Sequence, residues 1–325
     1  MTFDELGSTP FAELQDRQVA GYGDRPFLTF YDDARGERVE LSYKTFDNWV
    51  QKVANLLADE YGIGRGDRVA TIAGDHWQVS AVAFACWAVG ACLVPIDLEE
   101  PPEGKAAILA ATGAGLAFVR EEWLAEVTAA APGVTVVALV ADLFGKPAMD
   151  LGGVTAFSRI VPGMPDRYDG ETGVLDDPAL TVLASGTSAP AGVVLSAADL
   201  LVRAAAITAR WEVTELDRTL TAVANHDVDG LVTSHVVPFG AGAGAVITRG
   251  FSPDPLWKRV ADEKVSVLSL TAYQVEQLLD APGGPDGLDL SRLRTIVYDA
   301  GRPPGAVAER WSERFGLELR SWDVR

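Results

Sequence analysis

Apolar residues in this chain occur in two alternating patterns, short continuous runs and longer stripes with helical spacing. The clearest stripe extends from Tyr43 to about Glu60, where apolar side chains recur every three or four residues. This spacing is typical of a helix packed against a sheet. The run at 66–73 predicts a buried strand, 77–89 a helix and 91–96 a second buried strand. Strands and helices in this order predict a mostly parallel sheet covered by helices.

The segment from Gln78 to Ile96 contains no charged residue and is almost long enough to cross a bilayer. Gly90 interrupts it, and the residues on either side differ in pattern. Ala and Val with helical spacing precede this glycine, and a short strand-like run follows it. The interruption favours a buried helix followed by a buried strand over a membrane span.

The same order of elements returns about 150 residues later. We expect strands at 219–224, 245–248 and 265–270 and helices near 228–238 and 254–262. His76 and His226 lie 150 residues apart (226 − 76), and each follows a predicted strand. This repetition predicts a duplicated α/β unit, although alternation without common origin would give the same pattern. Open parallel sheets bind ligands at their carboxyl edge, so a site is expected in the crevice between the units.

Residues 150–178 are rich in Gly, Pro and Asp and show no long periodicity. We interpret them as the crossing between the two units. The predicted fold is therefore α/β, with two similar layered αβα subdomains and mostly parallel sheets. The first subdomain is expected at 1–170, and the second, which carries a loop suited to phosphate, at 171–325.

Composition narrows the functional classes. With 48% hydrophobic residues and 22% charged residues, the chain is too apolar to be mainly disordered. The formal net charge of −19, without any basic block, argues against nucleic acid and against an anionic membrane as partners. Cys86 and Cys92 are the only cysteines, and both lie in an apolar stretch. They predict reduced, buried thiols and a cytoplasmic location.

The segment 180–201 is the most informative for chemistry. A buried strand is followed by a loop rich in hydroxyl groups and then by a helix. Backbone N–H groups and the hydroxyls of Ser185, Thr187 and Ser188 are donors that suit phosphate. A phosphate loop usually supplies a lysine, but the nearest cation here is Arg203, inside the next helix. A turn whose hydroxyls cap local backbone groups would have the same residues, so both interpretations stay open.

Two local signals are structural. Ser196 can cap the helix that follows the loop, with Asp199 three residues on as its reciprocal partner. The glycines of 240–246 alternate as in a dinucleotide fingerprint, but a helix precedes them and a strand follows. This order is the reverse of what the fingerprint requires, so close packing of small residues explains them better.

His226 and His235 have Asp227 and Asp229 nearby, which raises the question of a metal site. Structural zinc needs closer ligand pairs and four ligands, so we predict no metal site. His226 is the better candidate for lining a pocket, and a capping or solvated loop histidine is the alternative. His76 is expected to have a structural role. A catalytic triad is not favoured, because Ser185 lacks the first glycine of a nucleophile elbow.

Several segments, in order along the chain, resemble the adenylate-forming superfamily, which includes acyl-CoA synthetases, luciferases and peptide-synthetase adenylation domains. The resemblance is carried by LSYKTFDNWVQKVANLL with GIGRGDRVA, CWAVGACLVPIDLEEP, ASGTSAPAGVVLS (184–196), ANHDVDGLV (224–232) and the stretch from LRTIVYDAGRPPG onward. It implies the fold of that superfamily's N-terminal domain, binding of ATP or AMP with Mg²⁺, and a small carboxylic acid or acyl group as substrate. It assigns the nucleotide to Ser185, Gly186, Thr187, Ser188 and Gly192, and the substrate pocket to His226, Asp229 and Gly301.

The chain departs from the family pattern at two places. The family loop typically reads Thr-Ser-Gly-Thr-Thr-Gly-x-Pro-Lys-Gly-Val; here one residue is lost before Pro190, and Ala191 replaces the lysine. Losing this ammonium removes roughly 1.5–3 kcal/mol per charged hydrogen bond, so weak or lost nucleotide binding is expected. The family continues into Tyr-Gly-x-Thr-Glu where this chain reads SWDVR. Trp322 is expected to replace the tyrosine that stacks on adenine, and the metal-holding glutamate has no counterpart.

The resemblance therefore implies a catalytically incomplete protein. The mobile C-terminal domain that bears the family's catalytic lysine is expected to be absent, as in a pseudoenzyme or one half of a split ligase. One alternative is an active adenylate-forming ligase that is completed by a partner chain supplying this domain. A second alternative is a scaffold or regulatory subunit that no longer binds nucleotide.

Overall fold

The computed structural model describes residues 3–140, 150–183, 192–299 and 304–322. Its strands are β1 (Pro26–Asp32), β2 (Glu37–Ser42), β3 (Arg68–Ile72), β4 (Cys92–Pro95), β5 (Leu116–Arg120), β6 (Thr135–Leu139), β7 (Thr155–Ala156), β8 (Pro178–Leu183), β9 (Gly192–Ser196), β10 (Arg218–Thr221), β11 (Gly244–Thr248), β12 (Val267–Thr271), β13 (Thr295–Asp299) and β14 (Arg320–Ser321).

The longer helices are α2 (Phe11–Tyr22), α3 (Tyr43–Asn55), α4 (Trp77–Val89), α5 (Pro102–Thr112), α8 (Ala197–Arg210), α11 (Pro253–Asp262), α12 (Ala272–Asp280) and α13 (Pro304–Phe315). The shorter helices are α1 (Phe3–Gly7), η1 (Leu56–Glu60), η2 (Glu121–Trp123), α6 (Leu124–Ala130), α7 (Phe157–Ile160), η3 (Val161–Gly163), α9 (Val228–Leu231), η4 (Val232–Val236) and α10 (Val237–Ala241).

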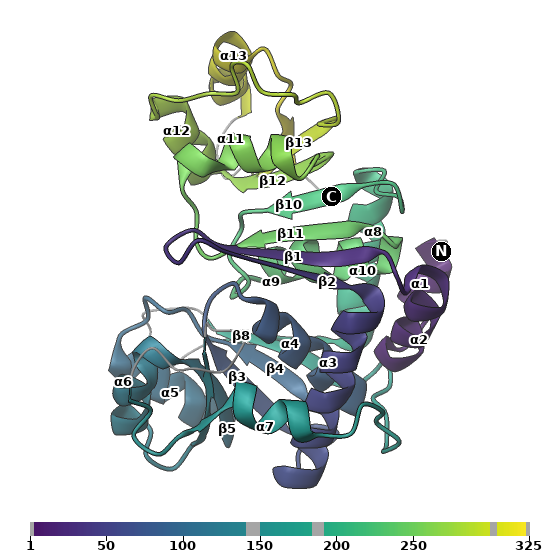
Figure 1. The fold of residues 1–325 in the computed structure, drawn as a ribbon, viewed down its shortest axis with the longest axis vertical. Helices are drawn as coiled ribbons and strands as arrows, with labels where there is room; N and C mark the ends of the chain where they lie inside the picture. The colour runs from purple at the N-terminus through teal and green to yellow at the C-terminus, as the bar shows by residue number, and fades with distance from the viewer. Residues whose placement is uncertain (1–2, 141–149, 184–191, 300–303, 323–325) are drawn as a thin grey trace.

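Two seven-stranded sheets are stacked with helices between them and on both outer faces (Figure 1). Sheet A has the order β14-β13-β12-β10-β11-β1-β2, and sheet B has the order β7-β6-β5-β3-β4-β8-β9. Neighbouring strands are parallel except in the hairpins β1–β2 and β8–β9, which form one edge of each sheet. This arrangement confirms the predicted α/β fold with mostly parallel sheets.

The two sheets have the same topology. Strands β3 to β7 have the same order in sheet B as strands β10 to β14 have in sheet A. Each strand of the second set follows its counterpart by about 150 residues in the sequence. This correspondence confirms the repeated α/β unit that the sequence predicts; a common origin of the two units stays a prediction. The hairpins, however, are exchanged between the units. β1 precedes the strands of sheet B in the chain but pairs with β11 of sheet A, and β8 pairs with β4 of sheet B.

Because of this exchange, the sheets do not divide at residue 170. Residues 26–42 lie in the sheet of the second unit, and residues 178–196 lie in the sheet of the first. A cut at 170 would remove the edge hairpin from each sheet and expose the main-chain groups of β4 and β11. The boundary predicted from composition therefore marks the crossing segment and does not separate two independent sheets.

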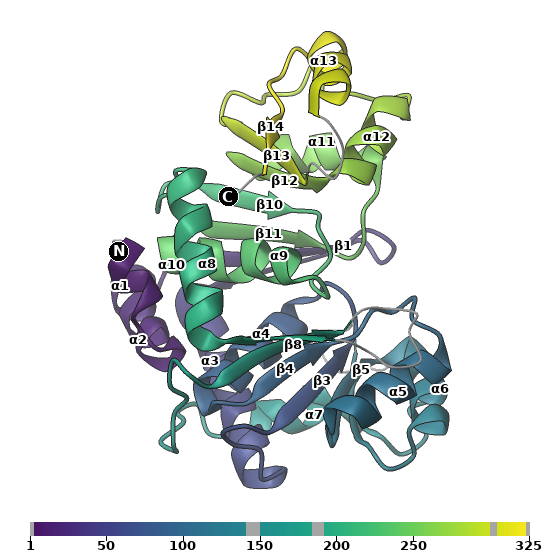
Figure 2. The ribbon, with the colours of Figure 1, turned by 180° about the vertical axis from the view of Figure 1, so that it is seen from behind.

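The apolar residues form one core between the sheets and one on each outer face. Successive residues of a strand point to opposite faces, so Val69 of β3 packs in the central core and Ala70 in the outer core of sheet B. Helices α5 and α6 cover this outer face, and α11, α12 and α13 cover the outer face of sheet A (Figure 2). Helices α3, α4, α8 and α10 lie in the middle layer.

Burial of α4 on all sides explains the uncharged stretch of the sequence. All 13 residues of this helix are buried, because it lies in the layer between the sheets. Gly90 ends the helix with a φ of 79°, a left-handed conformation that glycine adopts at no steric cost, and β4 then begins at Cys92. The predicted division into helix and strand is confirmed. Within the described residues, no helix has both the length and the hydropathy needed to cross a membrane.

An aromatic cluster in the middle layer joins the two units. Phe84 of α4 packs against Phe239 of α10 with ring centroids 4.7 Å apart, and against Phe46 of α3 at 5.2 Å. Phe27 of β1 packs against Phe239 at 5.0 Å and against Tyr43 at 4.9 Å. Edge-to-face and tilted aromatic pairs add to the stabilisation from burial. The cluster therefore holds the exchanged hairpin and helices of both units in one core.

Helix starts follow the predicted capping signals. Ser196 and Asp199 form a capping box at the start of α8, and Ser42 accepts a hydrogen bond from the backbone of Thr45 at the corresponding start of α3. The predicted helix from Tyr43 to Glu60 is present, with its last turn wound as the π-helix η1. The glycines of 240–246 are closely packed, as predicted. A Cβ on Gly242, which has a φ of 74°, would lie 2.4 Å from the Tyr22 ring.

The loops that follow β3 and β10 are equivalent in the two units, and they touch each other. The side-chain amide of Asn225 donates a hydrogen bond to the backbone oxygen of Gly74, with a length of 2.9 Å. The backbone N–H of Asn225 donates to the Asp75 carboxylate. Burial nevertheless raises the pKa of Asp75 to about 7, because solvation of the charged form is lost.

Replacing Phe84 by alanine is expected to lower the free energy of unfolding by about 3–5 kcal/mol, because it leaves a cavity where both units meet. Urea unfolding followed by tryptophan fluorescence measures this change. Tyr273, whose side chain is 68% exposed, provides the control, since Tyr273→Ala removes an aromatic ring without opening the core. Equal losses for the two variants would contradict the role of the cluster.

Asp75→Asn is expected to change how stability depends on pH. Because the folded state raises the pKa of Asp75, the free energy of unfolding falls as the pH rises from the ordinary aspartate range to about 7. The amide has no such penalty, so the variant should gain about 1–3 kcal/mol relative to the parent by pH 8 and little at pH 4. Denaturant titrations at several pH values measure the difference. Glu276→Gln, on the exposed side of α12, should show no trend.

Candidate functional site

A cavity of about 360 Å³ opens at the carboxyl ends of β4, β8 and β10. Sheet B contributes residues from β4, β8, β9 and the segment that follows β4, and sheet A contributes the loop after β10. The described lining residues are Pro95, Ile96, Asp97, Glu100, Ile108, Val182, Leu183, Val193, His226 and Asp227. The cavity therefore lies between the sheets, at the edge where parallel α/β sheets bind ligands.

The lining is apolar on one part and acidic on another. The apolar part comes from strand ends and from Ile108 of α5, and the acidic part consists of Asp97, Glu100 and Asp227. None of the described lining residues is a lysine or arginine. The imidazole Nε2 of His226 lies 3.7 Å from Oδ2 of Asp97. The described lining therefore contains three acidic side chains and no lysine or arginine, a composition that does not favour an anion.

Strands β8 and β9, which precede and follow the predicted phosphate loop in the sequence, contribute Val182, Leu183 and Val193 to the cavity lining. Ser185, Gly186, Thr187 and Ser188 lie outside the described residues. Gly192, at the start of β9, pairs with Leu183 of β8. A Cβ at Gly192 would lie 3.1 Å from the backbone oxygen of Val182, so glycine permits the close approach of the two strands. Assignment of this segment to nucleotide binding stays a prediction.

The structure separates the residues predicted to form the substrate pocket. His226 lines the cavity, whereas Gly301 lies outside the described residues. Asp229, at the start of α9, forms an ion pair with Arg203 of α8, with Nε of the arginine 2.6 Å from the carboxylate. Asp229 is not among the described lining residues of the cavity, whereas Asp227, two residues earlier, is one of them. Arg203, the cation nearest the loop in sequence, is thus paired away from the cavity.

Trp322 is packed in the core. Its ring meets Trp211 edge to face with centroids 5.0 Å apart, and its side chain is only 7% exposed. The backbone N–H of Trp322 donates to Tyr298, which continues the pairing of β14 with β13. The adenine-binding role of Trp322 stays a prediction.

The other two histidines are buried and structural. The Nδ1 of His76 accepts a hydrogen bond from the backbone of Gln78 and caps α4, as the sequence predicts for a structural residue. Burial and the nearby Arg249 lower the pKa of His76 to about 3. His235 lies between the helices of the two units, with its Nε2 2.6 Å from Oγ of Ser80. Burial lowers the pKa of His235 to about 4.

Metal ligands do not gather in the described part of the chain. No group of three or more His, Cys, Asp or Glu side chains there is arranged to hold a metal ion. His226 and His235 point into different environments, one lining the cavity and one buried against Ser80. Magnesium is bound by carboxylate oxygens, and Asp97 and Asp227 offer such atoms, but they do not form a complete set with a third ligand.

Sequence reasoning missed Asp97 and Glu100 as cavity residues. Asp97 comes directly after the buried strand that ends at Pro95, and parallel strands present such residues at their carboxyl edge. The position of Asp97 just after a buried strand was therefore the sequence signal that could have identified it as a cavity residue. Glu100 is only 6% exposed beside the start of α5, a location that depends on folding of the connecting segment. Asp75, which contacts Asn225 of the equivalent loop, was missed for the same reason.

Comparison with known proteins identifies relatives of this architecture. A "TIGR03089 family protein" of Mycobacterium tuberculosis (strain ATCC 25618 / H37Rv) is 35% identical over 246 residues, which cover 74% of this chain and 90% of that protein. The crotonobetaine/carnitine–CoA ligase of Salmonella paratyphi A is 24% identical over 324 residues, covering 97% of this chain and 61% of the ligase. The chain thus spans about three fifths of the length of that ligase.

Solved structures share the fold. The anthranilate CoA ligase AuaEII in complex with anthranoyl-AMP superimposes with a TM-score of 0.82 at 19% identity, covering 98% of this chain and 60% of that chain. The N-terminal domain of FACL13 from Mycobacterium tuberculosis gives a TM-score of 0.81 at 16% identity, with 97% and 76% covered. Residues 15–321 match the family described as AMP-binding enzyme. The chain therefore belongs to the AMP-binding enzyme family, which the sequence resemblance predicts.

Proposed function

We propose that this chain is an AMP-binding, acyl-CoA-synthetase-like protein that binds nucleotide weakly and does not complete adenylation by itself. The observation that carries the proposal is the charge of the crevice. Asp97, Glu100 and Asp227 line the cavity between the sheets, and no described lining residue is a lysine or arginine. Family membership supports a nucleotide or acyl-adenylate as the class of ligand.

The chemistry of adenylation explains why this charge matters. A carboxylate attacks the α-phosphate of ATP, and Mg²⁺ and cationic side chains neutralise the charge that develops on the leaving pyrophosphate. Both reactants are anions. The repulsion between a unit negative charge and a carboxylate 4 Å away is about 1 kcal/mol in water and about 4 kcal/mol near a protein surface. Ala191 stands where the family loop has its lysine, so the sequence offers no compensating cation there.

The apolar part of the cavity supports an acyl or aryl group as the second ligand. Ile96, Ile108 and Leu183 provide hydrophobic contacts, and a volume of about 360 Å³ suits a small organic acid. The ligases among the relatives act on crotonobetaine or carnitine and on indoleacetate, all small molecules that carry a carboxyl group. A small carboxylic acid, free or as its adenylate, is therefore the substrate class we propose.

Calorimetry with ATP, AMP and a non-hydrolysable acyl-adenylate mimic tests the binding part of the proposal. We expect weak binding of ATP and tighter binding of the mimic, which carries fewer charges and fills the apolar part. Asp227→Asn should tighten ATP binding about 3–10-fold at low ionic strength, because it removes one repulsive charge. Glu276→Gln, which removes an equal charge from an exposed residue outside the described lining of the crevice, should leave affinity unchanged. The absence of heat with all three ligands would favour a scaffold role instead.

Pyrophosphate exchange with a panel of carboxylic acids tests the catalytic part. The purified chain alone is expected to give no exchange above background, because the leaving group is not neutralised. A complete acyl-CoA ligase assayed in parallel shows that the reagents work. Exchange catalysed by this chain alone would overturn the proposal of incompleteness while leaving the family assignment intact.

A further inference from the structure

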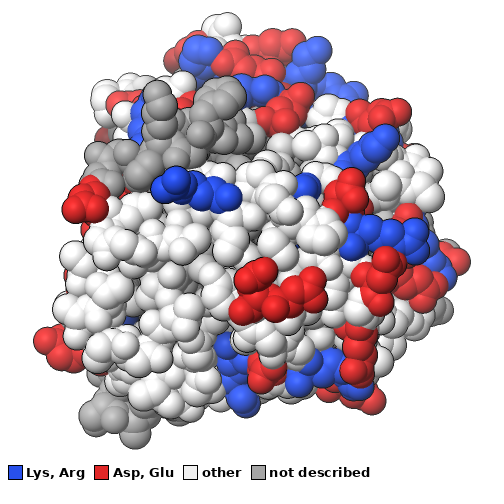
Figure 3. All heavy atoms as spheres, turned by 60° about the horizontal axis from the view of Figure 1, so that its bottom comes forward, with Lys and Arg blue, Asp and Glu red and all other residues white. Residues whose placement is uncertain are grey.

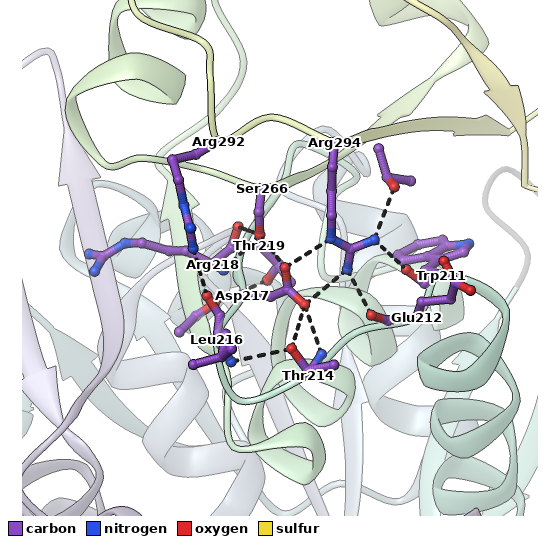
Figure 4. Close-up of polar contacts among 12 residues, drawn as sticks. Trp211, Glu212, Thr214, Leu216, Asp217, Arg218, Thr219, Ser266, Arg292 and Arg294 are labelled. Carbon is purple, nitrogen blue, oxygen red and sulfur yellow. Dashed lines mark hydrogen bonds and ion pairs between the residues drawn. The ribbon is translucent and has the colours of Figure 1, made fainter.

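Three arginines converge on the loop between α8 and β10. Arg294, just before β13, donates to the Asp217 carboxylate at 2.9 and 3.1 Å, and to backbone oxygens at the end of α8 (Figure 4). Arg292 donates to the backbone oxygen of Leu216 at 3.2 Å, and Arg25 to that of Glu215. Asp217 itself accepts from the backbone N–H of Thr214 at 2.8 Å, which closes the loop. Two segments distant in the sequence, 292–294 and the one that contains Arg25, therefore fix its conformation together with the loop's own hydrogen bond.

This fixed loop presents an apolar side chain to solvent. Leu216 is 71% exposed, more than the other large hydrophobic residues that the structure leaves at its surface. Leucines on loose loops are common, but here the backbone oxygen of the same residue is held by Arg292. A preorganised apolar contact binds a partner without the entropy cost of ordering a loop.

Unpaired cations surround Leu216. A surface cavity of about 430 Å³ beside it is lined by four basic residues, Arg25, Arg218, Lys264 and Arg292, but by only two acidic ones, Asp217 and Glu263. Asp217 is paired with Arg294, and Glu263 with Arg218. The remaining three cations form no ion pair with a carboxylate in the described part of the chain. Arg25 and Arg292 donate to backbone oxygens, and the Arg25 guanidinium also lies over the Tyr22 ring, 5.2 Å from its centroid. Lys264 interacts electrostatically with Asp289 without forming an ion pair.

This surface is distinct from the crevice. Its residues lie where β10, β11 and β12 begin, whereas the crevice lies where the parallel strands end. A second surface cavity, of about 490 Å³, adjoins it and shares Leu216, Asp217 and Arg292. Leu216 thus lines two adjoining surface cavities. The lining of the 430 Å³ cavity has more basic than acidic residues, although the formal net charge of the whole chain is −19.

We propose that Arg25, Leu216, Lys264 and Arg292, called here the Leu216 surface, dock an acidic polypeptide segment of a partner protein that places an apolar side chain against Leu216. Charge complementarity selects this occupant. A free phosphate would use the cations but not the exposed leucine. A second copy of this chain brings a net charge of −19 against an equal charge, which opposes association at long range.

Fluorescence anisotropy of labelled helical peptides, added to the full chain at low ionic strength, tests the proposal. The probes are a Glu/Leu peptide, a Glu/Ser peptide of equal charge and an uncharged Gln/Leu peptide. The Glu/Leu peptide is expected to bind at least about fivefold more tightly than either other peptide, and added salt should weaken it. Failure of the Glu/Leu peptide to bind saturably would overturn the proposal.

Variants locate the binding. Lys264→Asn and Arg292→Gln should each weaken the Glu/Leu peptide about threefold or more, and Leu216→Ser should remove its advantage over the Glu/Ser peptide. Arg167→Gln, at an arginine 82% exposed on the other unit, removes the same charge and serves as the control. Equal effects at Arg167 and at the Leu216 surface would overturn the proposal. So would displacement by tripolyphosphate with no preference for leucine, or a dimer that the surface variants dissociate.

Discussion

Exchange of the two edge hairpins is the constraint on which the rest of the structure depends. Each unit completes its sheet with a hairpin from the other, so β1 is paired with a strand more than two hundred residues away in the sequence. The helices that follow the hairpins, α3 and α8, are thereby fixed in the layer between the sheets. Because both sheets are anchored to the same middle layer, the loops after β3 and β10 face each other. The crevice opens at the same edge of the sheets, between the segment that follows β4 and the loop after β10.

Sequence patterns predicted the elements well where the signal was local. Spacing and capping identify α3 and α8, Gly90 divides the uncharged stretch, and the offset between His76 and His226 reveals the repeat. The hairpins were missed, because β1, β2 and β9 become strands through partners far away in the chain. Asp227 and Asp229 are two residues apart in the sequence, and only the fold decides which of them faces the cavity. Residues 184–191 and Gly301 are predicted but lie outside the described residues.

The distribution of cations links the fold to the chemistry. Many arginines are engaged in holding segments together: Arg249 pairs with Asp32 and with Glu122 of the other unit, and Arg294 holds the loop before β10. On the face shown in Figure 3, acidic and basic side chains are interspersed and a broad area carries neither. The crevice receives no lysine or arginine from its described lining, whereas three such residues gather around Leu216.

The residues that hold the sheets together differ from the polar residues that line the crevice. The aromatic cluster and the hairpin pairing that hold the sheets together do not include Asp97, Asp227 or His226. Substitution of Asp227, which is exposed, or of the half-buried Asp97 and His226 is therefore expected to cost less stability than truncation of the aromatic cluster. Membership in the family follows from the core and its topology, whereas adenylation requires cations at the rim. A chain can keep the first and lose the second, which is why fold alone does not establish activity here.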